Sequence, residues 1–283
     1  MSNKPLVSVI IPTKNSGGTI GECIKSVKNQ TYKNLEIIVV DNNSSDKTQQ
    51  IVEDLRLKIK DLRLSLYTKG PERSAQRNFG ASKAKGDYLL FVDSDMELSK
   101  TVIEYCIRQV ESYKVNKVLG GIIIPEKSFG IGFWAKCKAL ERSFYVGVDW
   151  IEAARFFKRS VFVEFKGYDE NQTGTEDYDL PQRIKEKYGE NTISRINAFI
   201  MHNEGKLSLT YTLKKKFYYA KTANEYVKTN SKYFSKQANP VNRYILYFSK
   251  PEQLFKNPVV GFGMLFMKTF EFAAGGFGYI LGL

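Results

Sequence analysis

The chain has 283 residues, of which 42% are hydrophobic and 26% are charged, and its formal net charge is +13. This composition is typical of a globular protein and excludes an intrinsically disordered one. The length suffices for one large α/β domain with an appendage or for two modest domains. The positive charge favours an anionic partner, which leaves nucleic acid, an anionic membrane surface and phosphorylated substrates as candidates.

The cysteines and the hydropathy of the chain indicate its cellular compartment and its relation to the membrane. Cys23, Cys106 and Cys137 are widely spaced, so we expect reduced thiols of a cytosolic protein rather than a disulfide framework or a zinc site. Residues 1–12 lack the long apolar region and the cleavage site of a signal peptide. No stretch reaches the roughly 18 apolar, uncharged residues of a membrane-spanning helix, so we expect no clean transmembrane span.

Apolar runs alternate with amphipathic segments over the N-terminal third. The runs at residues 6–11, 35–40 and 88–92 have the length and composition of buried strands. We expect helices from Ile20 and over residues 74–84, and a further helix–strand unit over roughly 46–68. This alternation predicts βαβ crossovers, and hence an α/β fold with a mostly parallel sheet flanked by helices.

The pattern changes in the remaining two thirds. We expect a strand at 118–124, a helix at 129–145, and a helix that opens at 175–180 with Pro181 in its first turn. From residue 206 onward basic and aromatic residues are interleaved, and residues 253–283 are apolar with several glycines. We therefore predict an α/β domain over residues 1–205 and a helical segment over residues 206–283.

Acidic residues stand where predicted strands end, which is where parallel α/β sheets bind ligands. Asp93 and Asp95 follow five apolar residues directly. Two carboxylates at that spacing can share Mg²⁺ or Mn²⁺ with a ribose or a diphosphate. The alternative is a pair of solvated loop aspartates, and the preceding strand makes us favour the metal site. Asp41 also follows a strand, and for it we favour a contact with a nucleobase N–H; for Asp46 a helix cap is at least as good an explanation.

Other charged residues are ambiguous when each is taken alone. Arg73 and Arg77 have the chemistry for bidentate phosphate contact, but ordinary arginines on a helix surface explain their spacing equally well. Glu176 and Asp177 stand at a helix start, where an ionised carboxylate is favoured and can act as a general base, although simple capping explains them as well. His202, the only histidine, follows the apolar residues 198–201.

Six stretches in chain order resemble the motifs of glycosyltransferase family 2, whose members have the GT-A fold. They are residues 7–15, 37–48, 73–80, 91–95, 167–170 and 176–177. The resemblance covers roughly residues 5–205, and the ordered set is far more specific than any one member. The glutamine of Ala75-Gln-Arg-Asn78 departs from the commoner Ala-Arg-Asn, so either Arg73 or Arg77 matches the donor-contacting arginine.

The resemblance implies inverting transfer of a sugar from a UDP- or GDP-linked donor to a hydroxyl group, with Mn²⁺ or Mg²⁺ as cofactor. It implies that the donor is bound by Pro12, Thr13, Asn15, Asp41, Arg73, Arg77, Asp93 and Ser94. The metal ligands that it implies are Asp93, Asp95 and His202. Asp177 matches the general base, with Glu176 beside it, and no covalent nucleophile is needed.

The C-terminal segment lies outside these motifs. Lysines 214–216 precede aromatic residues, and the apolar residues 258–272 are interrupted by Lys268 and Glu271, three apart on one helical face. We favour interfacial helices on an anionic leaflet over packing onto the catalytic domain or a partner subunit. A lipid-linked acceptor or a growing glycan, and a peripheral position on the cytoplasmic face of the cell membrane, follow from this hypothesis.

Two other functions use the same features less well. A nucleic-acid-binding protein would exploit the positive charge, but the acidic strand ends would repel phosphates unless a metal intervened, so we expect no nucleic-acid partner. A nucleotidyltransferase acting on sugar phosphates also pairs an α/β sheet with metal-binding carboxylates. It requires a Gly-rich triphosphate loop with a lysine after the first strand, and Gly17-Gly18 with Lys14 matches that poorly.

Overall fold

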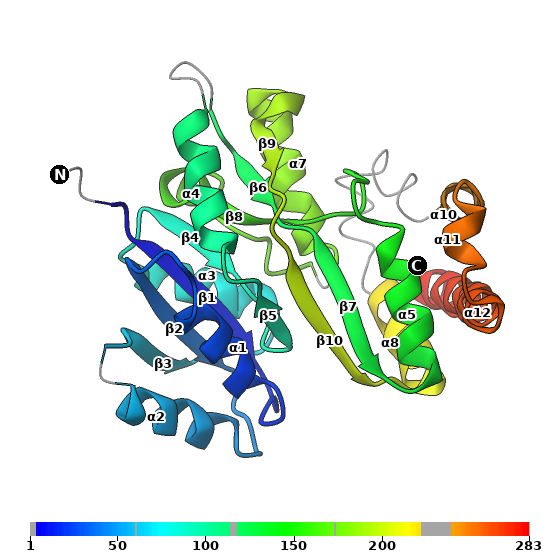
Figure 1. The fold of residues 1–283 in the computed structure, drawn as a ribbon, viewed down its shortest axis with the longest axis horizontal. Helices are drawn as coiled ribbons and strands as arrows, with labels where there is room; N and C mark the ends of the chain where they lie inside the picture. Colours follow the sequence, from blue (N-terminus) through cyan, green and yellow to red (C-terminus); the bar gives the residue numbers. More distant parts are fainter. Residues whose placement is uncertain (1–3, 60, 114–117, 173, 222–238, 283) are drawn as a thin grey trace. The chain divides into compact units, whose positions relative to one another are not determined.

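The computed structural model of the protein describes residues 4–59, 61–113, 118–172, 174–221 and 239–282. The chain divides into two compact units, and each is described here by itself (Figure 1). Unit 1 comprises Met1–Pro125, Ala153–Glu170 and Glu176–Met201. Unit 2 comprises Glu126–Glu152, Asn171–Thr175 and His202–Leu283.

Unit 1 is built on a seven-stranded sheet with the strand order β3-β2-β1-β4-β8-β6-β9. Its strands are β1 (Val7–Thr13), β2 (Leu35–Asp41), β3 (Leu64–Thr68), β4 (Tyr88–Phe91), β6 (Gly121–Ile123), β8 (Ala154–Lys158) and β9 (Ile193–Arg195). Strand β1 pairs parallel with β2 and β4, and β2 pairs parallel with β3. Strand β8 runs antiparallel to β4 and β6. The mostly parallel sheet expected from the sequence is therefore confirmed.

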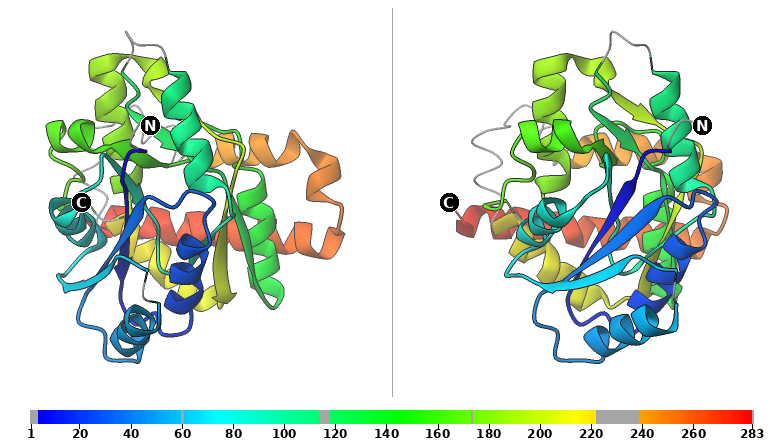
Figure 2. Two further views of the ribbon diagram at one scale, coloured as in Figure 1. Left: turned by 60° about the vertical axis from the view of Figure 1, so that its left-hand side comes forward. Right: turned by 90° about the vertical axis from the view of Figure 1, so that its left-hand side faces the viewer.

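Helices cover both faces of this sheet (Figure 2), which is why β1 is buried along its whole length. On one face alternate residues such as Val9 and Ile37 pack with α1 (Ile20–Lys28), α2 (Thr48–Lys58) and α4 (Val102–Ser112). On the other face Ile10 and Ile38 pack with α3 (Arg73–Lys83), α6 (Arg159–Glu164) and α7 (Glu176–Tyr188). The short elements β5 (Met96–Leu98) and η1 (Glu190–Thr192) complete the unit.

Unit 2 combines two strands with helices. The strands β7 (Glu126–Ile131) and β10 (Ile200–Lys206) are neighbours in a second sheet. The helices are α5 (Phe133–Ser143), α8 (Leu209–Lys221), α10 (Pro240–Phe248), α11 (Pro251–Leu254) and α12 (Pro258–Gly282). Among the described residues, no helix combines the length and the apolar character needed to cross a membrane.

The helix expected over residues 129–145 is partly wrong. Residues up to Ile131 continue β7, and the helix α5 begins only at Phe133. Gly132 separates the two elements with a φ of 90°, a left-handed conformation that glycine adopts without a steric penalty. The aromatic residues of this stretch therefore belong partly to a strand and partly to a helix.

The two units interleave along the chain rather than meeting at residue 205. Residues 126–152 lie in unit 2 because β7 neighbours β10 and because α5 packs against α12. These contacts join segments far apart in sequence, and a local sequence pattern does not encode them.

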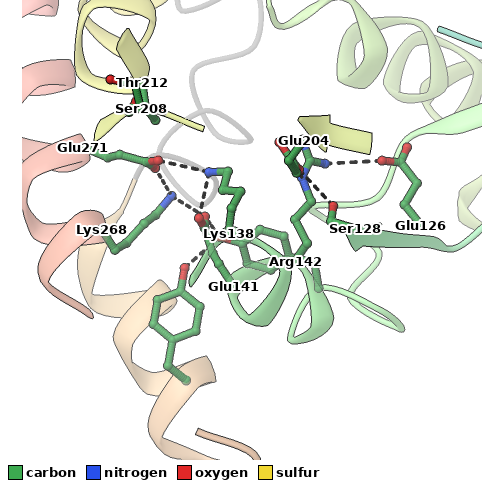
Figure 3. A network of polar contacts seen from close by, with 12 residues as sticks. Glu126, Ser128, Lys138, Glu141, Arg142, Glu204, Ser208, Thr212, Lys268 and Glu271 are labelled. Atoms are coloured by element: carbon green, nitrogen blue, oxygen red, sulfur yellow. Dashed lines mark hydrogen bonds and ion pairs between the residues drawn. The ribbon is translucent and has the colours of Figure 1, made fainter. Parts of the chain in front are cut away.

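A closed ring of four ion pairs joins α5 to α12 inside unit 2 (Figure 3). Lys138 Nζ lies 2.7 Å from Glu141 and 3.0 Å from Glu271. Lys268 Nζ lies 2.6 Å from Glu141 and 2.9 Å from Glu271. All four side chains are buried, and the Tyr145 hydroxyl also donates to Glu141. Lys268 and Glu271, which interrupt the apolar C-terminal segment in the sequence, thus point into the protein.

Candidate active site

Three strand ends of unit 1 carry the predicted donor-binding residues. The parallel register pairs Pro12 with Val40 and Thr13 with Asp41, and Asp93 follows β4 on the other side of β1. Thr13 is 3% exposed, and its Oγ1 has no hydrogen-bond partner in the described part of the chain. A buried hydroxyl without a partner at the ligand-binding edge of a sheet fits a site that a ligand completes.

Hydrogen bonds connect the loops after β1 and β2. Asn15 Oδ1 accepts from Ser45 N at 2.9 Å, and Asn15 N donates to Ser44 Oγ at 2.8 Å. Asp46 accepts from Thr48 N at the start of α2 and from Gly17 N, both at 2.9 Å. The Thr48 hydroxyl also donates to Asp46, and this side-chain hydrogen bond is the main cause that lowers the pKa of Asp46. Asp46 therefore ties the loop after β1 to the start of α2, but the N-cap residue of this helix is Lys47 and not Asp46.

Asp41 shapes the same loop. Its carboxylate is buried and accepts from Ser44 N at 2.8 Å and from Gln49 Nε2 at 2.6 Å, and the Ser44 hydroxyl bonds its other oxygen. A nucleobase contact by Asp41 stays a prediction, and it would use the acceptor capacity that these bonds leave. Ser94 is tied to the first loop, because its hydroxyl lies 2.8 Å from that of Ser16.

Gln76, the residue that departs from the family motif, has a clear structural task. Its side chain is 2% exposed, and Nε2 donates to the carbonyl oxygens of Thr13 at 3.0 Å and Val40 at 2.6 Å. These bonds tie α3 to the ends of β1 and β2. This role of Gln76 was not predicted from the sequence.

Three arginines and three carboxylates form a cluster at this edge of the sheet. Arg77 is fully buried and lies 2.7 Å from Asp93 and 2.7 Å from Asp177. Glu176 lies 3.3 Å from Arg73 and 3.5 Å from Arg77, and Arg155 lies 3.5 Å from Asp93. The structure thus brings together five residues that the sequence nominated separately. Arg155 was missed, although an arginine within the buried strand Ala154–Lys158 was a usable signal.

Charge and burial act differently on the carboxylates. Burial by itself raises the pKa of Asp93, but the positive charges of Arg77, Arg155 and Arg73 outweigh it and hold the pKa well below its usual range. Burial and the neighbouring charge of Asp177 raise the pKa of Glu176. The Glu176 side chain is 2% exposed and that of Asp177 is 21% exposed. Of the two adjacent acids, Asp177 is therefore the one that is accessible from solvent.

The predicted metal ligands lie in both units. Asp93 and Asp95 follow β4 in unit 1, whereas His202 lies in β10 of unit 2, where Nδ1 is 3.3 Å from Glu126 Oε2. In the described ranges, no group of three or more His, Cys, Asp and Glu residues is arranged to hold a metal ion. Mg²⁺ and Mn²⁺ often bind through one or two carboxylates together with substrate phosphates, and the Asp93–Asp95 pair fits such a shared site.

The fold and the ordered motifs define a glycosyltransferase of the GT-A class. The family model described as "Glycosyl transferase family 2" matches residues 8–174, which is more than half of the chain. The chain belongs to glycosyltransferase family 2. Its fold is similar to that of the mannosyltransferase PcManGT from Pyrobaculum calidifontis, solved with GDP-Man and Mn²⁺, with a TM-score of 0.67 and 16% identity over 99% of this chain and 88% of that one.

Two curated relatives are named for their lipid-linked acceptors. One is the GalNAc(5)-diNAcBac-PP-undecaprenol beta-1,3-glucosyltransferase of Campylobacter jejuni, 33% identical over 61% of this chain and 57% of the relative. The other is the UDP-Glc:alpha-D-GlcNAc-diphosphoundecaprenol beta-1,3-glucosyltransferase WfaP of Escherichia coli, 40% identical over 39% of this chain and 43% of the relative. The chain thus spans about half the length of the curated relatives that it matches.

Proposed function

We propose that this protein transfers a sugar from a nucleoside-diphosphate donor to an acceptor hydroxyl, with inversion at the anomeric carbon. The observation that carries the proposal is the contact of one buried guanidinium, Arg77, with Asp93 and Asp177 at the ligand-binding edge of a family 2 sheet. By the resemblance to the family motifs, Asp93 belongs to the donor site and Asp177 matches the general base. This contact supports the proposal of a proton acceptor beside a nucleotide site.

The reaction is a single displacement. Asp177 accepts the proton of the acceptor hydroxyl while its oxygen forms a bond to the anomeric carbon, and the bond to the diphosphate oxygen breaks. Asp93 and Asp95 are the proposed ligands of Mn²⁺ or Mg²⁺ in unit 1, and a role of His202 as a metal ligand stays a prediction from the family resemblance. A bound cation of this kind would neutralise charge that develops on the departing diphosphate. Thr13 Oγ1 and the loops around Asn15 and Asp41 would hold the nucleoside.

Asp177 suits the role of base better than Glu176 does. Its carboxylate reaches the surface of the unit, and Arg77 holds one oxygen, Oδ1, so that Oδ2 is the oxygen left to meet the acceptor. Glu176 is 2% exposed and its pKa is raised, first by burial, which disfavours the ionised form that a base requires. We assign Glu176 to shaping the charge around Arg77 and Arg73.

Product analysis tests the proposal. The protein is incubated with UDP- and GDP-linked sugars, Mn²⁺ and a polyprenyl-diphosphate-linked saccharide. We expect release of a nucleoside diphosphate and a product of inverted anomeric configuration. Release of pyrophosphate from a nucleoside triphosphate and a sugar phosphate would instead establish a nucleotidyltransferase. Absence of turnover with every donor, in a protein that binds no nucleotide, would contradict the proposal.

We also propose that unit 2 rests on an anionic membrane surface, where a lipid-linked acceptor is presented. The charged side of helix α12 faces the protein and not the solvent. Its two charged residues, Lys268 and Glu271, are buried in the ion-pair ring. Its outer face is apolar. Residues of α12 that are 45–69% exposed include Val259, Phe262, Phe266, Phe270, Phe277 and Ile280. An exposed apolar face of this kind marks an interaction surface, and lipid is the occupant to which we commit.

Neighbouring residues support the same surface. Val241, Ile245 and Phe248 of α10 are more than half exposed, and the exposed Lys250 and Lys256 lie on either side of α11. Apolar side chains flanked by lysines are the pattern expected of helices on an anionic leaflet, where each lysine near the surface contributes about 1 kcal/mol. The positive net charge of the whole chain acts in the same direction.

Vesicle flotation tests this surface. We expect the protein to float with phosphatidylglycerol-containing vesicles at low salt and the Phe266→Asp, Phe270→Asp double variant to remain at the bottom. Leu57→Asp is the matched control, because Leu57 is an apolar residue of α2 that is 74% exposed, outside unit 2. Equal flotation of the double variant and the control would exclude α12 as the lipid-binding face, as would a wild-type protein that does not float.

A further inference from the structure

The Arg77 guanidinium contacts both the proposed base, Asp177, and the proposed donor-side acid, Asp93. Arg77 Nη2 lies 2.7 Å from Asp93 Oδ1, and Nη1 lies 2.7 Å from Asp177 Oδ1. The sequence nominated Arg77 as a contact of the nucleobase or the diphosphate. Its side chain is 0% exposed, and both outer nitrogens are engaged by carboxylates of the protein itself. A direct contact with the donor is therefore not the role that the geometry favours.

Helix α3, which carries Arg77, is fixed against the sheet. The neighbouring residue Gln76 donates to the last carbonyl groups of β1 and β2, and the face of α3 toward the sheet includes Gly80, where a Cβ would lie 2.5 Å from Ile10 Cγ2. The aromatic ring of Tyr168 lies 5.3 Å from the guanidinium carbon. Close packing and hydrogen bonds thus fix the fork before any substrate arrives.

A single displacement needs such a fixed spacing. The base must meet the acceptor oxygen on one side of the anomeric carbon while the diphosphate leaves from the other, so the distance between base and donor-side groups limits how well the reacting atoms align. A planar guanidinium with two outer nitrogens sets that distance between two carboxylates. A lysine ammonium is a rotatable point charge, so it can contact two carboxylates but fixes their relative geometry less tightly than a planar guanidinium does.

We propose that Arg77 is a positioning residue that holds Asp177 and Asp93 in register as one rigid unit. The inference rests on the proposed function, since it takes Asp177 as the base and Asp93 as a donor-side residue. It assigns Arg77 no contact with donor or acceptor. Its effect on the rate passes through the spacing between Asp177 and Asp93, and this spacing no longer matters once the Asp177 carboxylate is removed, so Arg77 should then be dispensable for turnover.

The test is a double-mutant cycle of Arg77→Lys and Asp177→Asn, read in kcat and in donor KM. Misplacement of a reacting group by about 1 Å costs roughly a hundredfold in rate, so we expect kcat of Arg77→Lys to fall by about that factor with donor KM within about threefold of wild type. In the Asp177→Asn background, Arg77→Lys should change kcat by less than about threefold, because the two residues act as a unit.

Arg183→Lys is the matched control. Arg183 also uses its guanidinium on acceptors of the protein itself, with 2.8 Å to Asp179 Oδ2, 2.6 Å to the Phe165 oxygen and 2.7 Å to the Gly167 oxygen, although its side chain is 30% exposed. It lies on α7, as Asp177 does, but contacts neither Asp93 nor Asp177 in these bonds. We expect Arg183→Lys to lower the melting temperature while kcat stays near that of wild type. This control separates the general cost of replacing a hydrogen-bonded arginine from the specific effect of replacing Arg77.

Asp177→Glu provides the second variant, which does not depend on how well Arg77→Lys folds. Glutamate keeps the carboxyl chemistry but moves it by one methylene relative to Arg77 Nη1. The inference predicts a fall in kcat of about a hundredfold, whereas a base that needs no fixed position would keep near-normal turnover. The nucleotide affinity of Asp177→Glu, measured by calorimetry with Mn²⁺ and the nucleoside diphosphate, should equal that of the wild type.

The outcomes separate this inference from the proposed function. Lack of wild-type turnover, or near-normal turnover of Asp177→Asn, would overturn the proposed function before Arg77 is considered. If Asp177→Asn is inactive but Arg77→Lys raises donor KM alone, Arg77 serves the donor and the inference is wrong. Independent, multiplying effects of the two substitutions, or near-normal turnover of Asp177→Glu, would overturn it as well.

Discussion

Substitution of Glu271 by glutamine should loosen helix α12 from unit 2. The ring holds two lysines and two glutamates at distances of 2.6–3.0 Å, so its net charge is zero. Glu271→Gln leaves two buried ammonium groups with one carboxylate. Loss of one partner of a buried ion pair typically costs about 3–5 kcal/mol, because a charge stays buried without compensation. We expect a loss of that size in the free energy of unfolding at neutral pH.

Tryptophan fluorescence during urea unfolding measures this loss where it occurs. Both tryptophans of the chain, Trp134 and Trp150, lie in unit 2, and the Trp134 ring stacks on Phe266 of α12 at 6.2 Å. Glu22→Gln is the control, because Glu22 pairs with Lys25 at the same three-residue spacing but on the surface. An exposed pair contributes about 0–1 kcal/mol, so the control should unfold almost as the wild type does. A loss below about 1 kcal/mol for Glu271→Gln would refute the role given to the ring.

The same variant has a pH dependence with a defined sign. Burial raises the pKa of Glu271, but the charges of Lys138 and Lys268 outweigh it and lower the pKa from 4.5 to about 2. A depressed pKa in the folded state stabilises the fold above the ordinary pKa and loses this effect as the pH falls toward the folded value. The stability difference between wild type and Glu271→Gln should therefore shrink between pH 4.5 and pH 2. A difference that grows over this interval would contradict the charge assignment.

Three further outcomes are expected. Asp177→Asn should lower turnover by roughly a hundredfold to ten-thousandfold with little change in donor affinity, because general-base catalysis is lost while an amide oxygen still accepts from the arginine; single-turnover kinetics and calorimetry check this. Asp95→Ala should weaken Mn²⁺-dependent nucleotide binding as well as turnover and leave the melting temperature unchanged; retention of full activity in EDTA would contradict it. Gly278→Ala should destabilise the packing of α12 on α8, because a Cβ would lie 2.4 Å from the Phe217 oxygen, whereas Gly276→Ala, with nothing within 4 Å, should raise the melting temperature slightly.

The parallel sheet and its acidic edge could be predicted because each depends on a local signal. An apolar run of strand length followed at once by Asp93 specifies both a buried strand and a residue beyond its end. The positions of Asp41, Glu176 and Asp177 were found in the same way, from an acid next to a strand end or a helix start. Chain order of the motifs then indicated that these residues share one site.

Burial of charge could not be predicted by the same means. The spacing of Arg77 fitted a surface arginine and a phosphate contact equally well, and neither predicted its complete burial, which depends on Asp93 and Asp177 approaching it in the folded chain. Lys268 and Glu271 looked like interruptions of an apolar face, yet α5 supplies a complementary pair 127 or more residues away. Periodicity reports which residues share a helix face, but it does not report whether that face meets water or a matching set of charges.

The ion-pair ring also bears on how unit 2 responds to ionic strength. Dissolved salt screens charges that face the solvent over about 8–10 Å, but it screens buried ion pairs much less. The lysines near α11 face solvent, whereas those of the ring do not. Raised salt should therefore weaken the proposed attraction to an anionic leaflet and leave α12 seated on α5. The two attachments of this helix, one to lipid and one to its own protein, would then be separable by salt concentration alone.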